Sequence, residues 1–168
     1  MFKWKKLGLV LDPAKVENRP EWFHEFAQAP NAIVLDDCVR VYFCCRPKPD
    51  ARGQFVSRCA FVDLDRNDLT RILRISSEPI LPLGGLGEFD EFGTYPVSTI
   101  KVDETVFACY GGWTRCESVP FDVSLGMARS DDGGETFVKL GRGPMLSASL
   151  HEPFVVTSPK IRRYGGTW

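Results

Sequence analysis

The sequence has no excess of charge of either sign, since 21 lysines and arginines stand against 22 aspartates and glutamates. The net charge is −1, and acidic and basic residues are interspersed along the 168-residue chain. A nucleic-acid-binding protein needs a basic patch or stripe, and a membrane-surface protein needs a cationic face. The sequence therefore predicts neither nucleic acid nor membrane as a partner, and a neutral, sugar-like ligand fits it better than a polyanion.

Long apolar runs are also missing. The N-terminal stretch MFKWKKLGLVLDPAK contains only a short apolar run, residues 7–11, before an Asp-Pro pair. This run is too short for the apolar region of a signal peptide, and no later segment approaches the length of a membrane span. We therefore expect a cytoplasmic protein.

The cysteines have none of the paired spacings that bind zinc. Most of them fall in strand-like runs, where a free thiol behaves as a small apolar side chain. We therefore expect core thiols, no metal site and no other cofactor. The six cysteines are Cys38, Cys44, Cys45, Cys59, Cys109 and Cys116.

A repeat organises the chain. An acidic residue, a proline and a β-rich run recur in HEFAQAPNAIVLDDCVRVYF, DEFGTYPVSTIKVDETVFACY and HEPFVVTSPKIRRYGGTW. Glu25 and Glu91 lie 66 residues apart, Pro30 and Pro96 keep the same spacing, and Pro159 follows 63 residues later. A fixed period of this length is typical of stacked supersecondary units. We expect one partial domain, residues 1–168, with approximate repeats at 12–78, 79–143 and 144–168.

Each full repeat contains four strand-like runs. Runs of β-branched and aromatic residues flank the polar turns at 36–37 and 103–104, which predicts a hairpin in each repeat, and a second hairpin follows each one. An outermost strand is expected at 4–11, and the first strand of a third unit is expected to end at Trp168. The other expected strands are 31–35, 39–45, 55–62 and 69–75, then 97–102, 105–110, 122–129 and 136–140.

Four-stranded antiparallel meanders in tandem are typical of β-propeller blades, and an open β-sandwich is the alternative. The turn SDDGGETF favours blades, because it matches the S-x-D-x-G-x-T-W/F Asp box and is similar to turns between the outer blade strands of sialidases. In such a turn Asp132 accepts backbone N–H groups, Gly134 supplies unusual backbone angles and Phe137 fills the blade. We expect this turn to be structural rather than a calcium or catalytic site.

The chain resembles the five-bladed β-propeller glycosidase superfamily, which includes arabinanases, invertases, levansucrases and mannoside phosphorylases. It is most similar to glycosylase-like proteins of bacterial surface-polysaccharide clusters, over EFAQAP (25–30), FDEFGTYP (89–96) and SLHEPF (149–154). The resemblance runs from about Trp4 to the end and implies the N-terminal half of a propeller, about two and a half of its blades. It implies a glycoside hydrolase or phosphorylase that acts on a glycan at the central funnel.

In that superfamily an acidic residue stands directly before the proline that opens each innermost strand. This sequence has Ala29, Tyr95 and Ser158 at those positions. The starts of successive innermost strands surround one mouth of the funnel, so nearby acids are expected to face one another. One carboxylic acid would protonate the leaving oxygen and another carboxylate would act on the opposite face of the sugar. The candidates are Glu152 as the acid, Glu91 or Asp90 as its partner, and Glu25 as the third.

Substrate contacts are expected on the same rim, because the far end of a blade's second strand lies beside the start of its first. Arginine binds hydroxyl, carboxylate or phosphate groups, and an indole covers the apolar face of a pyranose. For the histidines the alternative is an ordinary loop position, and for the tryptophan it is packing between blades. The candidates are His24, Gln28, Arg46, Tyr95, Trp113, Arg115 and His151.

The open ends of a partial propeller would expose apolar blade faces and unpaired strand edges. We therefore expect either a homo-oligomer that associates through these faces or a longer chain. The leading hypothesis is a sugar-active enzyme. The alternatives are a non-catalytic carbohydrate-binding module and an assembly protein built from open blades.

Overall fold

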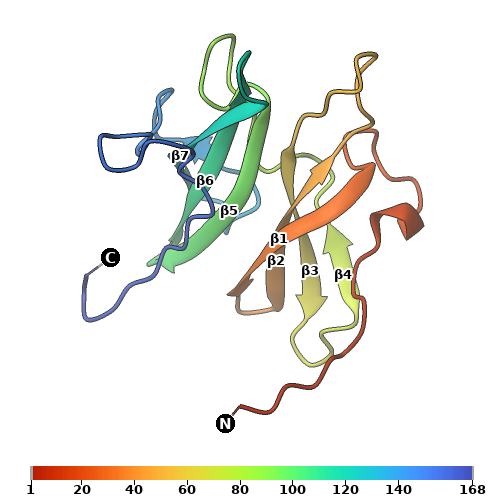
Figure 1. Cartoon of the computed structure of the whole chain (residues 1–168). Coiled ribbons are helices and arrows are strands. Elements are labelled where there is room, and N and C mark those ends of the chain that lie inside the picture. Colours follow the sequence, from red (N-terminus) through yellow and green to blue (C-terminus); the bar gives the residue numbers. More distant parts are fainter. Residues whose placement is uncertain (1, 168) are drawn as a thin grey trace.

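The computed structural model describes residues 2–167, which form two four-stranded antiparallel sheets (Figure 1). Each strand pairs with the next one along the chain, so both sheets are meanders. The predicted all-β fold and its two blade-like units are confirmed. Sheet 1 contains β1 (Glu25–Val34), β2 (Cys38–Arg46), β3 (Arg58–Asp65) and β4 (Ile72–Ile75). Sheet 2 contains β5 (Gly93–Val102), β6 (Thr105–Arg115), β7 (Phe121–Ser130) and β8 (Val138–Lys139).

The predicted hairpins form where short polar turns interrupt the β-rich runs. In sheet 2, Val102 pairs with Thr105 across a two-residue turn whose first residue, Asp103, has a φ of 53°. Aspartate tolerates this left-handed conformation better than most residues do. Sheet 1 lies within the expected first repeat and sheet 2 within the second.

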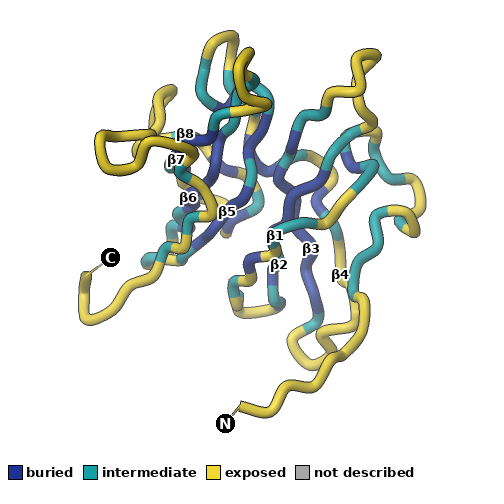
Figure 2. Tube along the Cα trace, viewed as in Figure 1, coloured by how far each residue is buried: buried dark blue, intermediate teal, exposed yellow. Residues whose placement is uncertain are grey.

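The main core lies between the two sheets, where buried stretches gather in Figure 2. Strand β2 shows how alternation builds this core, since Tyr42 and Cys44 face sheet 2 while Phe43 and Cys45 belong to a second cluster on the outer face of sheet 1. Polar bonds also join the sheets. The buried Asn31 side chain accepts the Thr99 N–H at 3.0 Å.

An irregular N-terminal segment covers the outer face of sheet 1, with Val10, Leu11 and Trp22 packed on the second cluster. The strand expected at 4–11 is wrong, because the structure has no strand there. Gly8 has a φ of 113°, and the chain then enters the short 3-10 helix η1 (Pro13–Lys15). Within residues 2–167, no helix has the length and apolar character that a membrane crossing requires.

The C-terminal segment runs beside sheet 2 without forming a strand between residues 140 and 167. The strand expected for a third blade is therefore wrong over the described residues, and Trp168, where it would end, lies outside them. Prolines supply no N–H donor for a ladder, and Ser158 has a φ of 56°. Instead, the Val156 N–H bonds the Val123 carbonyl at 3.0 Å, and Leu146 bridges to Leu125.

Candidate functional site

A pocket of about 730 Å³ opens where β2 and β6 end and β5 begins. Antiparallel pairing produces this convergence, since Glu25 at the start of β1 lies opposite Arg46, and Gly93 at the start of β5 lies opposite Trp113. The C-terminal segment closes one side. The lining includes Arg46, Gln54, Phe55, Tyr95, Trp113, Arg115, Phe121, Thr157 and Ser158.

The structure thus brings Arg46, Tyr95, Trp113 and Arg115 together, all of them residues that the sequence predicts as substrate contacts. The remaining expected contacts do not line the pocket. His24 donates its backbone N–H to the Arg46 carbonyl at 3.0 Å, and His151 is exposed on a separate turn. Gln28 lies opposite Cys44 between two irregularities of the β1–β2 register.

Trp113 presents an aromatic surface in the pocket. Its ring lies 6.2 Å from the Phe92 ring and 6.3 Å from the Phe121 ring, measured between centroids. Its indole passes so close to Gly93 that a Cβ there would lie 1.7 Å from Nε1. Gly93 is therefore needed for the tryptophan to take this position.

The guanidinium of Arg46 lies 5.3 Å from the centroids of both the Phe26 and Phe55 rings. Its Nε atom is buried and has no hydrogen-bond partner. Within residues 2–167, no carboxylate forms an ion pair with Arg46.

Arg115 is held by the loop that follows β2. Its Nη2 donates to the Phe55 carbonyl at 2.9 Å and lies 3.9 Å from an Asp50 carboxylate oxygen, and its Cζ lies 4.1 Å from the Phe92 ring centroid. Phe55 therefore contacts both arginines, the first through its ring and the second through its carbonyl. Phe55 was missed as a pocket residue, because it was assigned to a strand expected at 55–62. That strand start is wrong, since β3 begins at Arg58 and Phe55 lies in the loop before it.

The expected catalytic carboxylates do not line the pocket. Asp90 is fully buried, with its carboxylate 2.6 Å from Lys139 Nζ and 3.0 Å from the Tyr110 hydroxyl. Burial, followed by the charge of Asp90, raises the pKa of Tyr110, which keeps that hydroxyl protonated as a donor. Asp90 is therefore buried against β6 and β8 of sheet 2.

The three glutamates each have local partners. Glu25 Oε1 lies 3.8 Å from His24 Nε2, and Glu91 accepts the Gly87 N–H at 2.9 Å. Glu152 is exposed and accepts the Ser149 hydroxyl at 2.9 Å. Of the three, Glu25 is tied most directly to the pocket, because its cross-strand partner is Arg46.

Of the positions before the repeat prolines, Tyr95 and Ser158 line the pocket and Ala29 does not. The repeat pattern identifies these positions even though it predicts no carboxylate there. Among residues 2–167, no group of three or more histidine, cysteine, aspartate or glutamate side chains is arranged to hold a metal ion.

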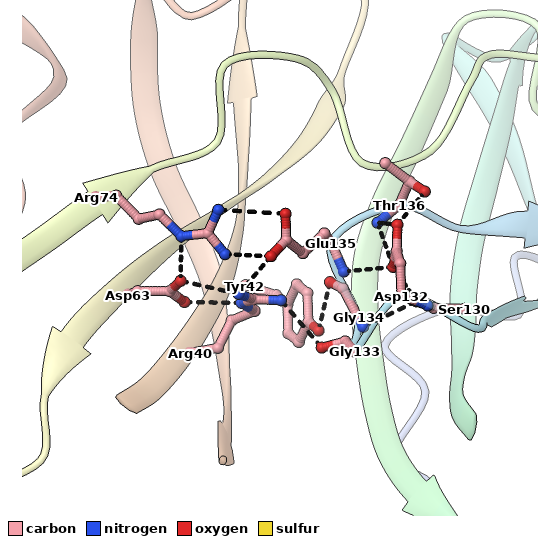
Figure 3. A network of polar contacts seen from close by, with 10 residues as sticks. All are labelled: Arg40, Tyr42, Asp63, Arg74, Ser130, Asp132, Gly133, Gly134, Glu135 and Thr136. Carbon is pink, nitrogen blue, oxygen red and sulfur yellow. Dashed lines mark hydrogen bonds and ion pairs between the residues drawn. The ribbon is translucent and has the colours of Figure 1, made fainter. Parts of the chain in front are cut away.

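The opposite end of the sheets carries a closed polar network (Figure 3). Arg40, Asp63 and Arg74 lie directly opposite one another on β2, β3 and β4. Arg40 donates to both Asp63 oxygens at 2.7 and 2.8 Å, and Arg74 donates to Asp63 at 2.8 Å and to Glu135. Burial opposes ionisation of Asp63, but hydrogen bonds and charge from Arg40 and Arg74 outweigh it and lower the pKa of Asp63.

The Asp-box turn completes this network, and its expected structural role is confirmed. Asp132 accepts the Glu135 and Thr136 N–H groups at 2.9 and 3.0 Å, and Gly134 has a φ of 87°. Phe137 is buried in the core between the sheets. The Tyr42 hydroxyl donates to the Gly134 carbonyl at 2.8 Å, which ties the turn to sheet 1.

Proteins of known sequence give one line of comparison. The uncharacterized protein Rv1502 of Mycobacterium tuberculosis is 30% identical to this chain over 166 residues, which are 98% of this chain and 52% of the relative. The uncharacterized protein MT1551 from another strain of that species matches to the same extent. The chain therefore spans about half the length of the curated relatives it matches. No protein-family model matches the chain.

Solved structures give a second line. A family 117 glycoside hydrolase from the marine bacterium Zobellia galactanivorans aligns with a TM-score of 0.69 and 18% identity, over 88% of this chain and 40% of that one. A glycosyl hydrolase from Bacteroides ovatus aligns with a TM-score of 0.53 and 17% identity, over 73% and 32% of the two chains. These likenesses show the fold. The two sheets match part of the structures of β-propeller glycoside hydrolases.

Proposed function

We propose that the chain is a carbohydrate-active, glycosidase-like part of a β-propeller and that it holds a glycan in the pocket at the ends of β2 and β6. One observation carries this proposal: Trp113, Arg46 and Arg115 line a single pocket in a fold shared with propeller glycoside hydrolases. The shared fold supports a sugar ligand by analogy. The side chains that line the pocket supply the groups that would bind the sugar.

The pocket has the groups that a pyranose needs. An indole such as that of Trp113 covers the apolar face of a sugar ring, with Tyr95 and Phe121 as neighbouring aromatic surfaces. Arginine N–H groups and the hydroxyls of residues such as Ser158 can bond sugar hydroxyls.

Cleavage or transfer of a glycosidic bond would require two carboxylates flanking that bond. Among the candidate acids, Glu25 is the best placed to act on a sugar in the pocket, because it lies opposite Arg46. Glu91 and Glu152 would be its partners, and substrate binding would have to bring them closer. Asp90 does not enter this proposal, because Lys139 and Tyr110 already bind its buried carboxylate.

The catalytic part is tested with Glu25→Gln, Glu91→Gln and Glu152→Gln in the full chain against a panel of oligosaccharides, with and without phosphate. A loss of about 10² to 10⁴ in turnover is expected for a carboxylate that transfers the proton. Glu104→Gln is the matched control, because the Glu104 side chain is 98% exposed and does not line the pocket. Undiminished turnover in all three variants would contradict catalysis by these acids.

A second candidate function is glycan binding without catalysis. It is favoured by the absence of any carboxylate among the described residues that line the pocket. Calorimetry would then show saccharide binding that Trp113→Ala weakens, with no product formed over long incubation. Product formation that depends on protein concentration would exclude it.

Self-association through an open blade face is a further part of the proposal. The outer face of β6 and β7 carries an apolar groove of about 750 Å³, lined by residues such as Phe107, Leu125, Met127 and the half-exposed Leu146. Light scattering at micromolar concentration tests this, and Leu146→Glu is expected to yield monomers if a second copy covers the groove. The expected cytoplasmic location stays a prediction.

A further inference from the structure

We propose that the glycan held in this pocket carries an anionic group, a carboxylate, sulfate or phosphate, that binds between Arg46 and Arg115. The inference rests on the proposed function and names the class of sugar. The overall charge of −1 favours a neutral ligand, but the charge of the pocket itself is different.

The pocket is locally cationic. Two guanidinium groups line it, and no carboxylate is among its described lining residues. Two acids lie next to the pocket: Asp50, 3.9 Å from Arg115 Nη2, and Glu25, which is opposite Arg46 in the β1–β2 ladder but forms no ion pair with it. Asp50 is half exposed and already accepts the N–H groups of Arg52 and Gln54 at 2.9 Å each, so it is held by its own turn.

Arg46 is the better placed of the two arginines to bind an anion. Aromatic rings flank its guanidinium, and its buried Nε lacks an acceptor. A donor that loses water without gaining a partner costs free energy, and an oxyanion would recover it with a charge-assisted hydrogen bond. Arginine suits this task because its planar fork matches the oxygens of carboxylate and phosphate groups.

Arg115 is positioned by its contacts, and its ion pair with Asp50 is long, at 3.9 Å. Its bond to the Phe55 carbonyl uses one donor, and the Phe92 ring supports the plane of the guanidinium. A guanidinium has five N–H donors, so most of them remain for a ligand. Since Phe55 contacts both arginines, the loop after β2 holds the two charges at one pocket.

The experiment compares matched ligand pairs on the full wild-type chain by calorimetry. The pairs are an oligouronate and its methyl ester, a sulfated galactan oligosaccharide and its desulfated form, and a sugar phosphate and the free sugar. At least one anionic member is expected to bind about tenfold more tightly than its neutral partner, with affinity falling as salt rises. The pair that responds identifies the anionic group.

Variants then assign the effect to the arginines. Arg46→Gln and Arg115→Gln are each expected to weaken the anionic ligand about tenfold or more and the neutral ligand about twofold or less. Arg129→Gln is the matched control, because Arg129 is exposed on β7, pairs with Asp131 and does not line the pocket. The wild-type comparison stands even if a variant folds poorly.

The outcomes separate the two proposals. Equal affinity for every anionic and neutral pair, still sensitive to Trp113→Ala, would overturn the anionic ligand and keep the sugar site. No binding of any saccharide would overturn the proposed function itself. Inorganic sulfate or phosphate binding as tightly as the anionic sugars would overturn the inference in favour of a simple anion site.

Discussion

The two ends of β2 differ in whether their arginine has a carboxylate partner. At the Asp-box end, Arg40 is 3% exposed and donates to both oxygens of Asp63, and Arg74 closes the network with Glu135. At the pocket end, Arg46 has aromatic neighbours and no carboxylate partner among the described residues. Both Arg40 and Arg46 belong to β2, six residues apart, on the face that carries Tyr42 and Cys44.

The difference shows that one strand can hold one arginine in a complete ion-pair network and leave another without a carboxylate partner within residues 2–167. A buried charge is tolerated when the fold supplies its partner, and Arg40 obtains Asp63 directly across the ladder. The residue opposite Arg46 in β1 is an acid too, Glu25, yet no ion pair joins them. The partnered end fastens the two sheets to each other, and the unpaired Arg46 Nε at the other end is the donor that the proposed ligand would use.

The comparison predicts its largest effect for Asp63→Ala. Arg40 would stay buried without its carboxylate, so the free energy of unfolding should fall by about 3 to 5 kcal/mol. Arg46→Ala should lower it by about 1 kcal/mol or less, because it removes only the contacts with the Phe26 and Phe55 rings. Urea denaturation of the two variants measures both values.

Glu104→Ala provides the baseline for that measurement, since Glu104 pairs with Lys101 at 3.9 Å and its own side chain is 98% exposed. Its cost is expected within about 0 to 1 kcal/mol. The comparison breaks down if Arg46→Ala is as destabilising as Asp63→Ala, because Arg46 would then be a structural residue.

Gly134→Ala tests the closed end with a smaller perturbation. A Cβ at this position would lie 2.2 Å from the Tyr42 hydroxyl, which is the group that bonds the Gly134 carbonyl. Gly133 also has a positive φ but nothing within 4 Å of a Cβ, so Gly133→Ala carries the backbone strain alone.

We expect Gly133→Ala to cost about 1 to 2 kcal/mol from backbone strain and Gly134→Ala about 1 to 3 kcal/mol more from the clash. The two variants are compared by thermal and urea unfolding. Equal costs would show that Tyr42 moves aside freely and that its bond does not fasten the sheets.

The closed end is also the part that the sequence predicts best. Asp-box chemistry is local, so Ser130, Asp132 and Gly134 determine the turn within a few residues of chain. The buried free cysteines follow from local pattern as well, with Cys116 the exposed exception. The failures lie where local pattern is weak. Residues 4–11 pack against sheet 1 only through Val10 and Leu11, without a ladder.

Only part of the pocket could be predicted from the sequence. Antiparallel geometry predicts that Arg46 and Trp113 lie near strand starts, and the pocket contains both. Phe55 comes from a loop, and loop courses depend on contacts that no sequence period encodes. Asp90 was expected at the funnel mouth, but its side chain points into the interior. Proximity to a strand start does not reveal which way a side chain points.

Acid titration tests how much the charge of Asp132 stabilises the Asp-box end. Burial alone would raise the pKa of Asp132, but hydrogen bonds from Ser130, Thr136 and the Glu135 N–H lower it to about 2. A depressed carboxyl pKa contributes stability above its ordinary value of 3.8, and that contribution is lost as the pH falls toward 2.

The stability gap between wild type and Asp132→Asn is therefore expected to be full at pH 5 and to shrink between about pH 4 and pH 2. Because Asp132 is exposed, the gap should be no more than about 1 kcal/mol. Urea midpoints across this range measure it. A gap that does not change with pH would assign the effect to turn shape rather than to charge.

Cysteine labelling gives the mildest test of which end is open. Burial raises the pKa of Cys109 to about 11, and burial together with Asp63 raises the pKa of Cys38 to about 12, so these thiols are protonated as well as inaccessible. Cys116 is exposed and lines the pocket. Iodoacetamide should therefore modify Cys116 at least about tenfold faster than any other cysteine in the native protein, as followed by peptide mass spectrometry.

A saturating pocket ligand should slow that reaction and leave labelling of the denatured protein unchanged. Comparable labelling of Cys38, which lies at the Asp-box end of β2, would show that this end opens as readily as the pocket.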